Sequence, residues 1–503
     1  MMKRNLTLLF LSIVFTTGAW ALEQDGEGCY LLGTVQDWKD FAALVQTTPT
    51  ANAKMTADIN LGDDQTMVGT EEHPYQGTFD GQGYTITYDL VSTDECCGLF
   101  AHLNGTVRNL YVDGTMQVNH DYAGSIAGKV NFPALIEQCH SKVKITANGG
   151  DYIGGLVGLS TGCYTPPYVR IQNCIYSGHI NGFSLHRSGI LGWADMGSNC
   201  SRTQITNCLV TAQIDDDVTG GTGHIIADGG YWGVNDETTV ASIGNCYYVY
   251  PYGSSTPYGA TQVTMEQVES GEVCCLLNVA KYIYDAVEYQ TIFRQNIGED
   301  KFPVFDPLHG LVKEITSMGY ASFAPGYFGL GNTSDNVIVP QGVEAYTGTL
   351  NGNSLLLHPA GNVIGGGNGN GFVLKGKPGF YSFVPTNEER TTIDNELDGG
   401  NQIMDTRYAT YYVLGEKDGV VGFYKYNVSD KVGMDSHVAF LLNPPTDVDM
   451  LTLSFEEGTS IQEIQHVQQV KDTSIYDLNG RHVKNATNGV NIVNGRKVLR
   501  SIK

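Results

Sequence analysis

One short motif recurs five times in this chain, and it constrains the fold more than any other feature. A β-branched residue is followed two positions later by Asn or Gln, and then by Cys or Leu. The copies are Val107-Arg108-Asn109-Leu110, Ile136-Glu137-Gln138-Cys139, Ile171-Gln172-Asn173-Cys174, Ile205-Thr206-Asn207-Cys208 and Ile243-Gly244-Asn245-Cys246. They begin 29, 35, 34 and 38 residues apart. Repeats of this length predict a solenoid, in which each unit buries its apolar face against its neighbours.

A second repeated element, a short apolar tetrad flanked by small residues, precedes each copy. The tetrads are Gly98-Leu99-Phe100-Ala101, Ser125-Ile126-Ala127-Gly128, Gly155-Leu156-Val157-Gly158, Gly189-Ile190-Leu191-Gly192 and Gly223-His224-Ile225-Ile226. After each motif the chain alternates apolar and polar residues, as from Cys174 to Ile180, with the period of two expected of a strand. Because the repeats hold strands and glycines without helical periodicity, we predict an all-β chain that begins with a β-solenoid resembling a parallel β-helix.

The motif cysteines have a simple expected role. Equivalent side chains stack from rung to rung in a solenoid, so Cys139, Cys174, Cys208 and Cys246 are expected to form an internal column of small, weakly polar groups. Metal binding is the alternative, although one Cys per rung does not make a tetrahedral pocket.

The flanking segments suggest how the chain is divided. The solenoid is expected to occupy residues 22–310, with an amphipathic helix from Trp38 to Val45 covering its open end and a closing helix from Thr264 to Asn278, followed by a strand that ends at Pro307. Short apolar strands punctuated by Gly, Asn and Pro predict a β-sandwich-like domain over residues 311–454. Residues 455–503 form a separate small β segment in this interpretation.

Two of the tetrads resemble a known bacterial repeat. Gly155-Leu156-Val157-Gly158 and Gly189-Ile190-Leu191-Gly192 each begin 19 residues before the motif Cys. In sequence and spacing they resemble the GLUG repeat of bacterial surface proteins, and the outer copies depart from it as capping rungs would. The resemblance implies a repeat protein displayed at the cell surface.

The last segment differs in charge and in pattern from the rest. From Lys471 onward it holds seven Lys or Arg against two Asp. Ile475 to Val483 and Gly489 to Val498 resemble the C-terminal sorting domain of the type IX secretion pathway of Bacteroidetes. That resemblance implies passage across the outer membrane, contact with the secretion machinery, and release or attachment at the cell surface. Asn-Gly pairs between the short strands favour tight hairpins and predict a small antiparallel meander.

The N-terminus predicts export. Lys3 and Arg4 precede an uncharged apolar run and a small-residue site ending at Ala21, so residues 1–21 are expected to be a secretory signal peptide. No later run approaches the roughly 20 apolar residues of a transmembrane helix, so no membrane-spanning segment is expected in the mature chain. We therefore expect the protein to be secreted or held at the outer face of the outer membrane.

Charge and cysteine content exclude some partners and leave others open. Loss of Lys3 and Arg4 would shift the formal net charge from −24 to about −26, which disfavours nucleic acid as a partner. The glycine-rich stretch from Gly365 to Gly371 lacks the ending of a phosphate-binding loop, so no nucleotide or other cofactor is predicted.

Eleven cysteines are an odd number, so not all of them can pair within one chain. Cys163 and Cys200, in loops after two tetrads, are candidates for a disulfide.

Candidate ligand-binding residues are aromatic. Exposed rings offer flat apolar faces with polar edges that suit sugars or a protein partner. The simpler interpretation, which the pattern favours, is that alternate rings pack inward and the rest cover the last rung. The candidates are Trp193, Tyr231, Trp232, Tyr248, Tyr250 and Tyr252. Adjacent carboxylates at Asp215, Asp216 and Asp217 are weak calcium candidates beside the simpler interpretation as a solvated turn.

Together these features favour a binding or adhesion protein that recognises a glycan or an extracellular protein. Two alternatives remain open. One is a polysaccharide lyase or glycosidase built on a β-helix, which would need converging carboxylates, and no catalytic residue is predicted here. The other is a structural stalk at the cell surface.

Overall fold

The computed structural model describes residues 22–92, 94–161, 168–195, 203–215, 222–223, 225–229, 232–233, 241–251, 259–278, 282–283, 286–287, 292–325, 336–365, 370–399, 403–404, 409–426, 432–433 and 437–456, and the strand backbones of residues 475–476, 482–483, 489–493 and 496–500. The prediction of an all-β protein is confirmed. Strands fill most of these residues, and the helices are 11, 5 and 6 residues long. None of the helices in this part of the chain is long and apolar enough to cross a membrane.

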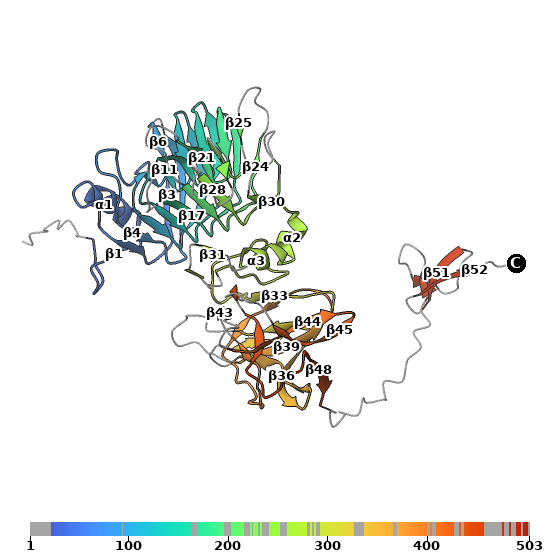
Figure 1. The fold of residues 1–503 in the computed structure, drawn as a ribbon. Coiled ribbons are helices and arrows are strands. Elements are labelled where there is room, and N and C mark those ends of the chain that lie inside the picture. Colours follow the sequence, from blue (N-terminus) through green and yellow to red (C-terminus); the bar gives the residue numbers. More distant parts are fainter. Residues whose placement is uncertain are drawn as a thin grey trace, which may run out of the picture.

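The first half of the chain coils into stacked rungs, so that four sheets of parallel strands run along one solenoid (Figure 1). Sheet 1 holds, in order, β1 (Tyr30–Leu32), β2 (Ala53–Met55), β4 (Thr78–Asp80), β8 (Thr106–Arg108), β12 (Leu135–Glu137), β17 (Val169–Gln172), β22 (Thr203–Thr206), β28 (Ala241–Gly244) and β27 (Trp232–Gly233). Sheet 2 holds β24 (Gln213–Ile214), β19 (His179–Phe183), β14 (Lys144–Asn148), β9 (Tyr111–Val118), β13 (His140–Ser141), β18 (Ile175–Tyr176), β23 (Leu209–Val210), β29 (Cys246–Tyr248) and β30 (Ala260–Gln262), with β3 (Ile59–Gly62) and β5 (Thr85–Ser92) joined through β9.

The two remaining sheets carry the segments around the tetrads. Sheet 3 holds β6 (Cys96–Cys97), β10 (Tyr122–Gly124), β15 (Tyr152–Gly154), β20 (His186–Ser188) and β25 (Thr222–Gly223). Sheet 4 holds β7 (Phe100–Leu103), β11 (Ala127–Asn131), β16 (Val157–Thr161), β21 (Leu191–Ala194) and β26 (Ala227–Gly229). Within a rung the chain therefore passes from sheet 3 through the tetrad to sheet 4, and then to sheets 1 and 2.

Strand pairing follows the register of the repeated motif. Val107, Ile136, Ile171, Ile205 and Ile243 pair in one continuous row across sheet 1. The tetrads also align, except the last: Leu191 pairs with Ala227 and Arg187 with Gly223. The equivalent of the Gly189 tetrad is thus Ile225-Ile226-Ala227-Asp228, two residues later than predicted, because matching by glycine alone set the wrong register.

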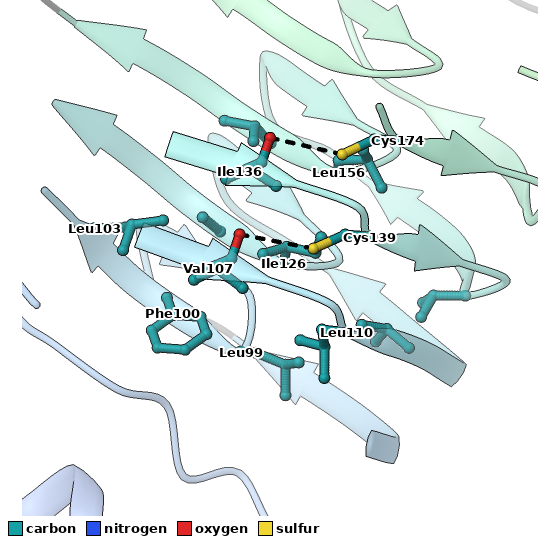
Figure 2. Close-up of a cluster of buried hydrophobic side chains, with 14 of the residues drawn as sticks. Leu99, Phe100, Leu103, Val107, Leu110, Ile126, Ile136, Cys139, Leu156 and Cys174 are labelled. Atoms are coloured by element: carbon teal, nitrogen blue, oxygen red, sulfur yellow. Dashed lines mark hydrogen bonds between the residues drawn. The ribbon is translucent and has the colours of Figure 1, made fainter. Parts of the chain in front are cut away.

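The cysteine column lies inside the solenoid, as predicted for a core role. Cys139, Cys174 and Cys208 are 0% exposed and Cys246 is 1% exposed. Each thiol donates a weak hydrogen bond to a carbonyl of the preceding rung, at 3.8 Å for Cys139 to Val107 and 3.7 Å for Cys174 to Ile136 (Figure 2). Because sulfur tolerates long contacts and fills small gaps, a Cys suits this repeated position.

The Asn of the motif turns the chain between sheets 1 and 2. Asn109, Asn173, Asn207 and Asn245 have φ of 53°, 54°, 54° and 52°, a left-handed conformation that Asn tolerates better than other non-glycine residues. Their amides stack, since Asn207 Nδ2 donates to Asn173 Oδ1 at 3.1 Å and Asn245 Nδ2 donates to Asn207 Oδ1 at 3.0 Å. The repeated Asn thus serves as both the turn residue and an inter-rung hydrogen bond.

The predicted capping helix is α1 (Val35–Val45), which begins at a capping box formed by Thr34 and Asp37. It buries Trp38, Phe41, Ala42 and Val45. The Trp38 ring lies edge-on to Phe79 and Phe100 of the first rungs, with centroids 5.8 Å away in both cases. Full burial of each large apolar side chain contributes roughly 1.5–3 kcal/mol, so the helix closes the solenoid end by ordinary core packing.

At the other end the predicted closing helix is two helices. α2 (Met265–Glu269) and α3 (Glu272–Leu277) are separated at Gly271, whose φ of 87° breaks the helical path. Their apolar side chains pack with Ile175, Leu209 and Tyr247 of sheet 2, so the helices cover an outer face of the solenoid. The strand expected to end at Pro307 is reduced to a single bridge between Arg294 and Val304.

The second unit, residues 311–456, is built on a nine-stranded sheet. Its order is β34 (Tyr320–Phe323), β39 (Phe372–Gly376), β36 (Val343–Asn351), β37 (Ser354–Pro359), β48 (Met450–Phe455), β45 (Val420–Tyr426), β44 (Tyr411–Lys417), β47 (Ala439–Leu442) and β42 (Asp398–Gly399). Shorter sheets pair β33 (Leu311–Ile315) with β40 (Gly379–Phe383), join β38 (Val363–Ile364), β35 (Asn336–Ile338) and β41 (Pro385–Thr386), and pair β43 (Ile403–Met404) with β46 (Val432–Gly433). A further short pair, β31 (Tyr282–Ile283) and β32 (Ala286–Val287), precedes this unit.

Both faces of the central strands of this unit are buried. On β36, Ala345 joins a cluster with β33, β35 and β40, whereas its neighbour Tyr346 joins a cluster with β44, β45 and β48. The large sheet therefore curls over one core while the shorter strands cover its other face. Ser382 of β40 links this unit to the segment before it, because its hydroxyl accepts from Ile297 N at 3.0 Å and donates to Gln295 O at 2.6 Å.

The C-terminal segment forms a four-stranded antiparallel sheet in the order β50 (His482–Val483), β49 (Ile475–Tyr476), β51 (Gly489–Val493) and β52 (Arg496–Arg500). β51 and β52 pair from Val493 with Arg496, so Asn494-Gly495 connects them as the predicted hairpin requires. The sheet departs from a simple meander, since β51 pairs with β49 rather than with β50.

Candidate functional site

The structure separates the aromatic residues that the sequence grouped together. Trp193 is partly exposed on β21, and Tyr250 is 44% exposed. The prediction of an exposed ring is wrong for Tyr248, which is 9% exposed and belongs to the main core. β29 lies between that core and the helices, so both of its faces are buried. For Trp232 only the backbone of β27 is described.

Tyr231 and Tyr252 lie outside the described residues. The same holds for Asp216 and Asp217 of the calcium candidate, and for Cys163 and Cys200 of the disulfide candidate. Asp215 is described, and its Oδ1 lies 2.9 Å from Nε2 of His179 on the neighbouring rung. Among the described residues, no three His, Cys, Asp or Glu side chains are grouped so that they could hold a metal ion.

A row of stacked rings crosses successive rungs at the solenoid surface. Tyr122, Tyr152 and His186 begin β10, β15 and β20 and pair in register. The rings of Tyr122 and Tyr152 lie 5.5 Å apart at 12°, and those of Tyr152 and His186 lie 5.2 Å apart at 9°. Trp193 of β21 joins the row, 5.2 Å from Tyr152 and 4.5 Å from His186. We call these four partly exposed residues the aromatic ridge.

Glycines bring the two sheets of the ridge together. A Cβ on Gly154 would lie 1.9 Å from the carbonyl oxygen of Val157, and one on Gly158 would lie 2.4 Å from the nitrogen of Ala123. Only glycine permits backbones to approach this closely. This close approach of the backbones places Tyr152 and His186, the first residues of β15 and β20, beside Trp193, the third residue of β21.

Charged groups surround the Tyr122 end of the ridge. Burial raises the pKa of the Tyr122 hydroxyl, and the nearby carboxylates of Glu95 and Asp121 raise it further. Burial also raises the pKa of the Cys96 thiol to about 12, against the opposing effect of the Lys129 ammonium. Tyr122 therefore stays protonated at neutral pH and can donate a hydrogen bond beside two carboxylates that can accept one.

The stacking geometry determines which parts of the rings are available. Nearly parallel rings at this spacing cover one another's faces, so Tyr122, Tyr152 and His186 present their edges and polar atoms. The indole of Trp193 is tilted by 45° against Tyr152 and by 55° against His186, so it is not part of the parallel stack. The ridge thus combines one tilted apolar ring with a line of hydrogen-bonding edges.

Sequence reasoning identified Trp193 but missed the other three ridge residues. Their signal lies in the residue three positions before each tetrad, which is Tyr122, Tyr152 and His186 in consecutive rungs. A single repeated aromatic position was obscured by the tyrosine-rich segment after residue 246, whose rings include the buried Tyr247 and Tyr248.

Comparisons with known proteins add little to this site. No protein-family model matches the chain, and no curated protein matches it. Among solved structures, a Bacteroides ovatus protein provisionally named as an immunoglobulin A1 protease shares 18% identity, with 56% of this chain and 94% of that chain covered and a TM-score of 0.39. At that TM-score the likeness carries no argument about fold or activity.

Proposed function

We propose that this protein is exported, is displayed at the cell surface or secreted, and binds a glycan through the aromatic ridge of its solenoid. The observation that carries the proposal is the uninterrupted run of ring contacts from Tyr122 through Tyr152 and His186 to Trp193 on partly exposed surface. A protein ligand of the same surface is the alternative that the test below distinguishes.

Sugar chemistry fits the available groups. A pyranose has apolar C–H faces that pack on an aromatic ring and hydroxyls that bond to polar edges, and sites for such ligands combine a few apolar rings with placed polar groups. Trp193 supplies the ring, whereas Tyr122, Glu95 and Asp121 supply hydrogen-bonding groups. Because the whole protein carries a formal charge of −24, uncharged sugars are favoured over uronate or sulfated ones.

A glycan array with the mature protein tests this directly, followed by affinity measurements on any hit with Trp193→Ala and Tyr152→Ala. Tyr84→Ala is the matched control, since Tyr84 is a 36% exposed ring elsewhere on the same solenoid. We expect each ridge variant to lose about tenfold or more, equivalent to about 1.4 kcal/mol, and the control to bind as wild type does.

Several outcomes would contradict the proposal. If no glycan binds, or if the ridge variants bind like the control, the ridge is a structural stack. Binding only to extracellular proteins would replace the ligand class, and release of sugar products during incubation would replace binding with hydrolysis or lyase activity.

The proposal of export draws on the two ends of the chain. Residues 1–21 have the order of a signal peptide, and the tail resembles a type IX sorting domain. The antiparallel sheet formed by β49, β50, β51 and β52 supports a separate small β unit at the C-terminal end. Deleting residues from Ser474 onward in the native host should leave a folded protein in the periplasm. Normal surface display of the truncated chain would refute the sorting role, and a misfolded product would indicate that the tail completes the second unit.

A further inference from the structure

The aromatic ridge presents one ring in each of three successive rungs, and this regular spacing constrains the shape of its ligand. Tyr122, Tyr152 and His186 are the first residues of β10, β15 and β20 and pair in register. Their ring centroids lie 5.5 Å and 5.2 Å apart. Backbones of neighbouring strands are about 4.8 Å apart, so the rings are spaced slightly more widely than the strands that carry them. A ligand that contacts all three rings must repeat its own groups at a similar interval.

A column of carboxylates runs beside the rings with the same spacing. The residues immediately before β6, β10 and β15 are Glu95, Asp121 and Asp151. They are in register, because Tyr122 N donates to Glu95 O at 2.8 Å. The equivalent bond in the next rung joins Tyr152 N to Asp121 O at 2.8 Å. Glu95 is exposed and the two aspartates are partly exposed, so hydroxyls of a ligand can find an acceptor in each of these rungs.

A row of sheet 4 borders the other side of the ridge and changes from polar to apolar along it. Lys129 of β11, Leu159 of β16 and Trp193 of β21 pair in register. Lys129 is partly exposed and lies in the rung of Tyr122, whereas Trp193 lies in the rung of His186. A ligand along the ridge therefore meets an ammonium donor and carboxylate acceptors at one end and an aromatic ring at the other.

Glycans of different shape make different use of this arrangement. A single terminal sugar spans one rung and leaves the others without contact. A maltose-type glucan, whose linkages begin at an axial oxygen, curves into a helix, so its successive sugars turn away from a straight row. In a chain linked through equatorial oxygens, as in cellulose, each sugar advances by about the length of one pyranose ring, which is close to one rung. Successive sugars are flipped in such a chain, but a hexose carries polar groups on both edges, so every rung meets a hydrogen-bonding group.

Given that the ridge binds a glycan, as proposed above, we propose that its ligand is a linear, equatorially linked hexose chain that lies along the solenoid axis with one sugar per rung. The rungs of Tyr122, Tyr152 and His186 hold three consecutive sugars. The sugar in the last of these rungs packs a C–H face on Trp193, and hydroxyls of the others donate to the carboxylates that precede β10 and β15. The ligand is thus an internal stretch of a polymer rather than the end of a branched glycan.

Linkage at constant length gives the first test, by calorimetric titration of the mature protein. The probes are cellotriose, β-linked mannotriose and chitotriose, which are all equatorially linked. Maltotriose is the matched control, because it contains the same glucose units as cellotriose and differs only in the configuration of its linkages. We expect at least one extended trisaccharide to bind, and maltotriose to bind about tenfold or more weakly than the best of them.

Chain length gives the second test. For the best extended ligand, affinity should rise several-fold from the disaccharide to the trisaccharide and change little beyond the tetrasaccharide. Tyr122→Ala removes the rung contact farthest from Trp193, so it should reduce the affinity for the trisaccharide to about that for the disaccharide and leave disaccharide binding unchanged. Tyr122→Phe keeps the stacked ring and should lose less, which controls for misfolding of the Ala variant. Tyr84→Ala should behave as wild type at every length.

Failure of this inference differs from failure of the proposed function. Equal or tighter binding of maltotriose, or ridge-dependent binding of branched glycans on the array without any extended trisaccharide, would overturn the extended chain and leave a glycan-binding ridge. The same follows if affinity is independent of length, or if Tyr122→Ala weakens the disaccharide and the trisaccharide equally. Binding of no glycan at all would refute the proposed function and the extended chain together.

Discussion

Replacing Cys174 by Asp tests the solenoid core most sharply, because the position is closed on every side. Cys174 is 0% exposed, and its thiol contacts the carbonyl oxygens of Ile136 at 3.7 Å and Gln172 at 3.1 Å. The two carbonyl oxygens are hydrogen-bond acceptors, and the adjacent thiols of Cys139 and Cys208 are only weak donors, so an ionised carboxylate would find no strong donor there. The matched control is Cys174→Asn, which has nearly the same size and polarity but does not titrate.

The magnitude follows from the pKa that the new Asp must adopt. Burial without a strong donor raises its folded pKa far above the unfolded value of about 3.9, so the folded variant keeps the group protonated. Holding it protonated costs about 1.4 kcal/mol for each pH unit above that value, or about 4 kcal/mol at pH 7. The penalty is absent below pH 3.9 and grows as pH rises, so between pH 5 and pH 7 it should increase by about 2.7 kcal/mol.

Urea unfolding followed by tryptophan fluorescence provides the assay. After residue 21 the tryptophans are Trp38, Trp193 and Trp232, all within the solenoid, so the fluorescence does not report unfolding of the second unit. The difference in unfolding free energy between the Asp and Asn variants cancels the titration of other groups. If that difference were small at pH 7, or constant from pH 5 to pH 7, the column would be open to water and the solenoid register argued here would be wrong.

Three further outcomes are expected. Burial lowers the pKa of His140 to about 3, so the imidazole stays neutral when the protein is folded. The wild type should therefore lose stability as pH falls below about 6.5, by at most about 1.4 kcal/mol per pH unit. His140→Gln should remove that part of the pH dependence of the unfolding free energy, measured by urea titration. Asn207→Ala should cost about 1–3 kcal/mol because it loses two amide hydrogen bonds and places Ala at φ of 54°, whereas Asn207→Gly should recover part of that loss in the same assay. The cysteine column should resist alkylation until the chain is denatured, as measured by peptide mass mapping, and modification in the folded protein would contradict its burial.

The solenoid could be predicted because its information is local and repeated. A one-residue slip would turn each Ile and Cys of the motif outward, so the pattern specifies the register of sheet 1. The prediction failed where the pattern weakened. Gly223 resembles a tetrad glycine but lies in β25, and Gly271 divides a helix that composition alone would continue.

The second unit and the ridge needed information that a local pattern does not hold. β37 pairs with β48, whose residues lie about one hundred positions later, and no repeat indicates that pairing. Ring stacking depends on the close approach of sheets 3 and 4, which follows from glycines that in sequence read only as turn residues.

Differences in rung length concentrate at one corner of the solenoid, and this bears on both the ridge and the disulfide. Three residues separate β11 from β12, whereas seven separate β16 from β17 and eight separate β21 from β22. The longer connections follow the sheet 4 strands that border the ridge, and loops on a rigid scaffold commonly carry specificity.

Cys163 and Cys200 lie in those two connections, but they are not equivalent positions. Ser160 pairs with Ala194 before the connections, and Val169 pairs with Thr203 after them. Both pairs are 34 residues apart in sequence, so the position equivalent to 163 in the next rung is 197. A disulfide needs Cα atoms within about 7 Å, so a bond between these cysteines requires the loops to depart from strict stacking by three residues. If it forms, it joins the connection after β16 to the connection after β21, the strand that holds Trp193, and reduction should weaken glycan binding without unfolding the core. Mapping of non-reduced peptides that found both thiols free would reject the bond and leave the loops independent of each other.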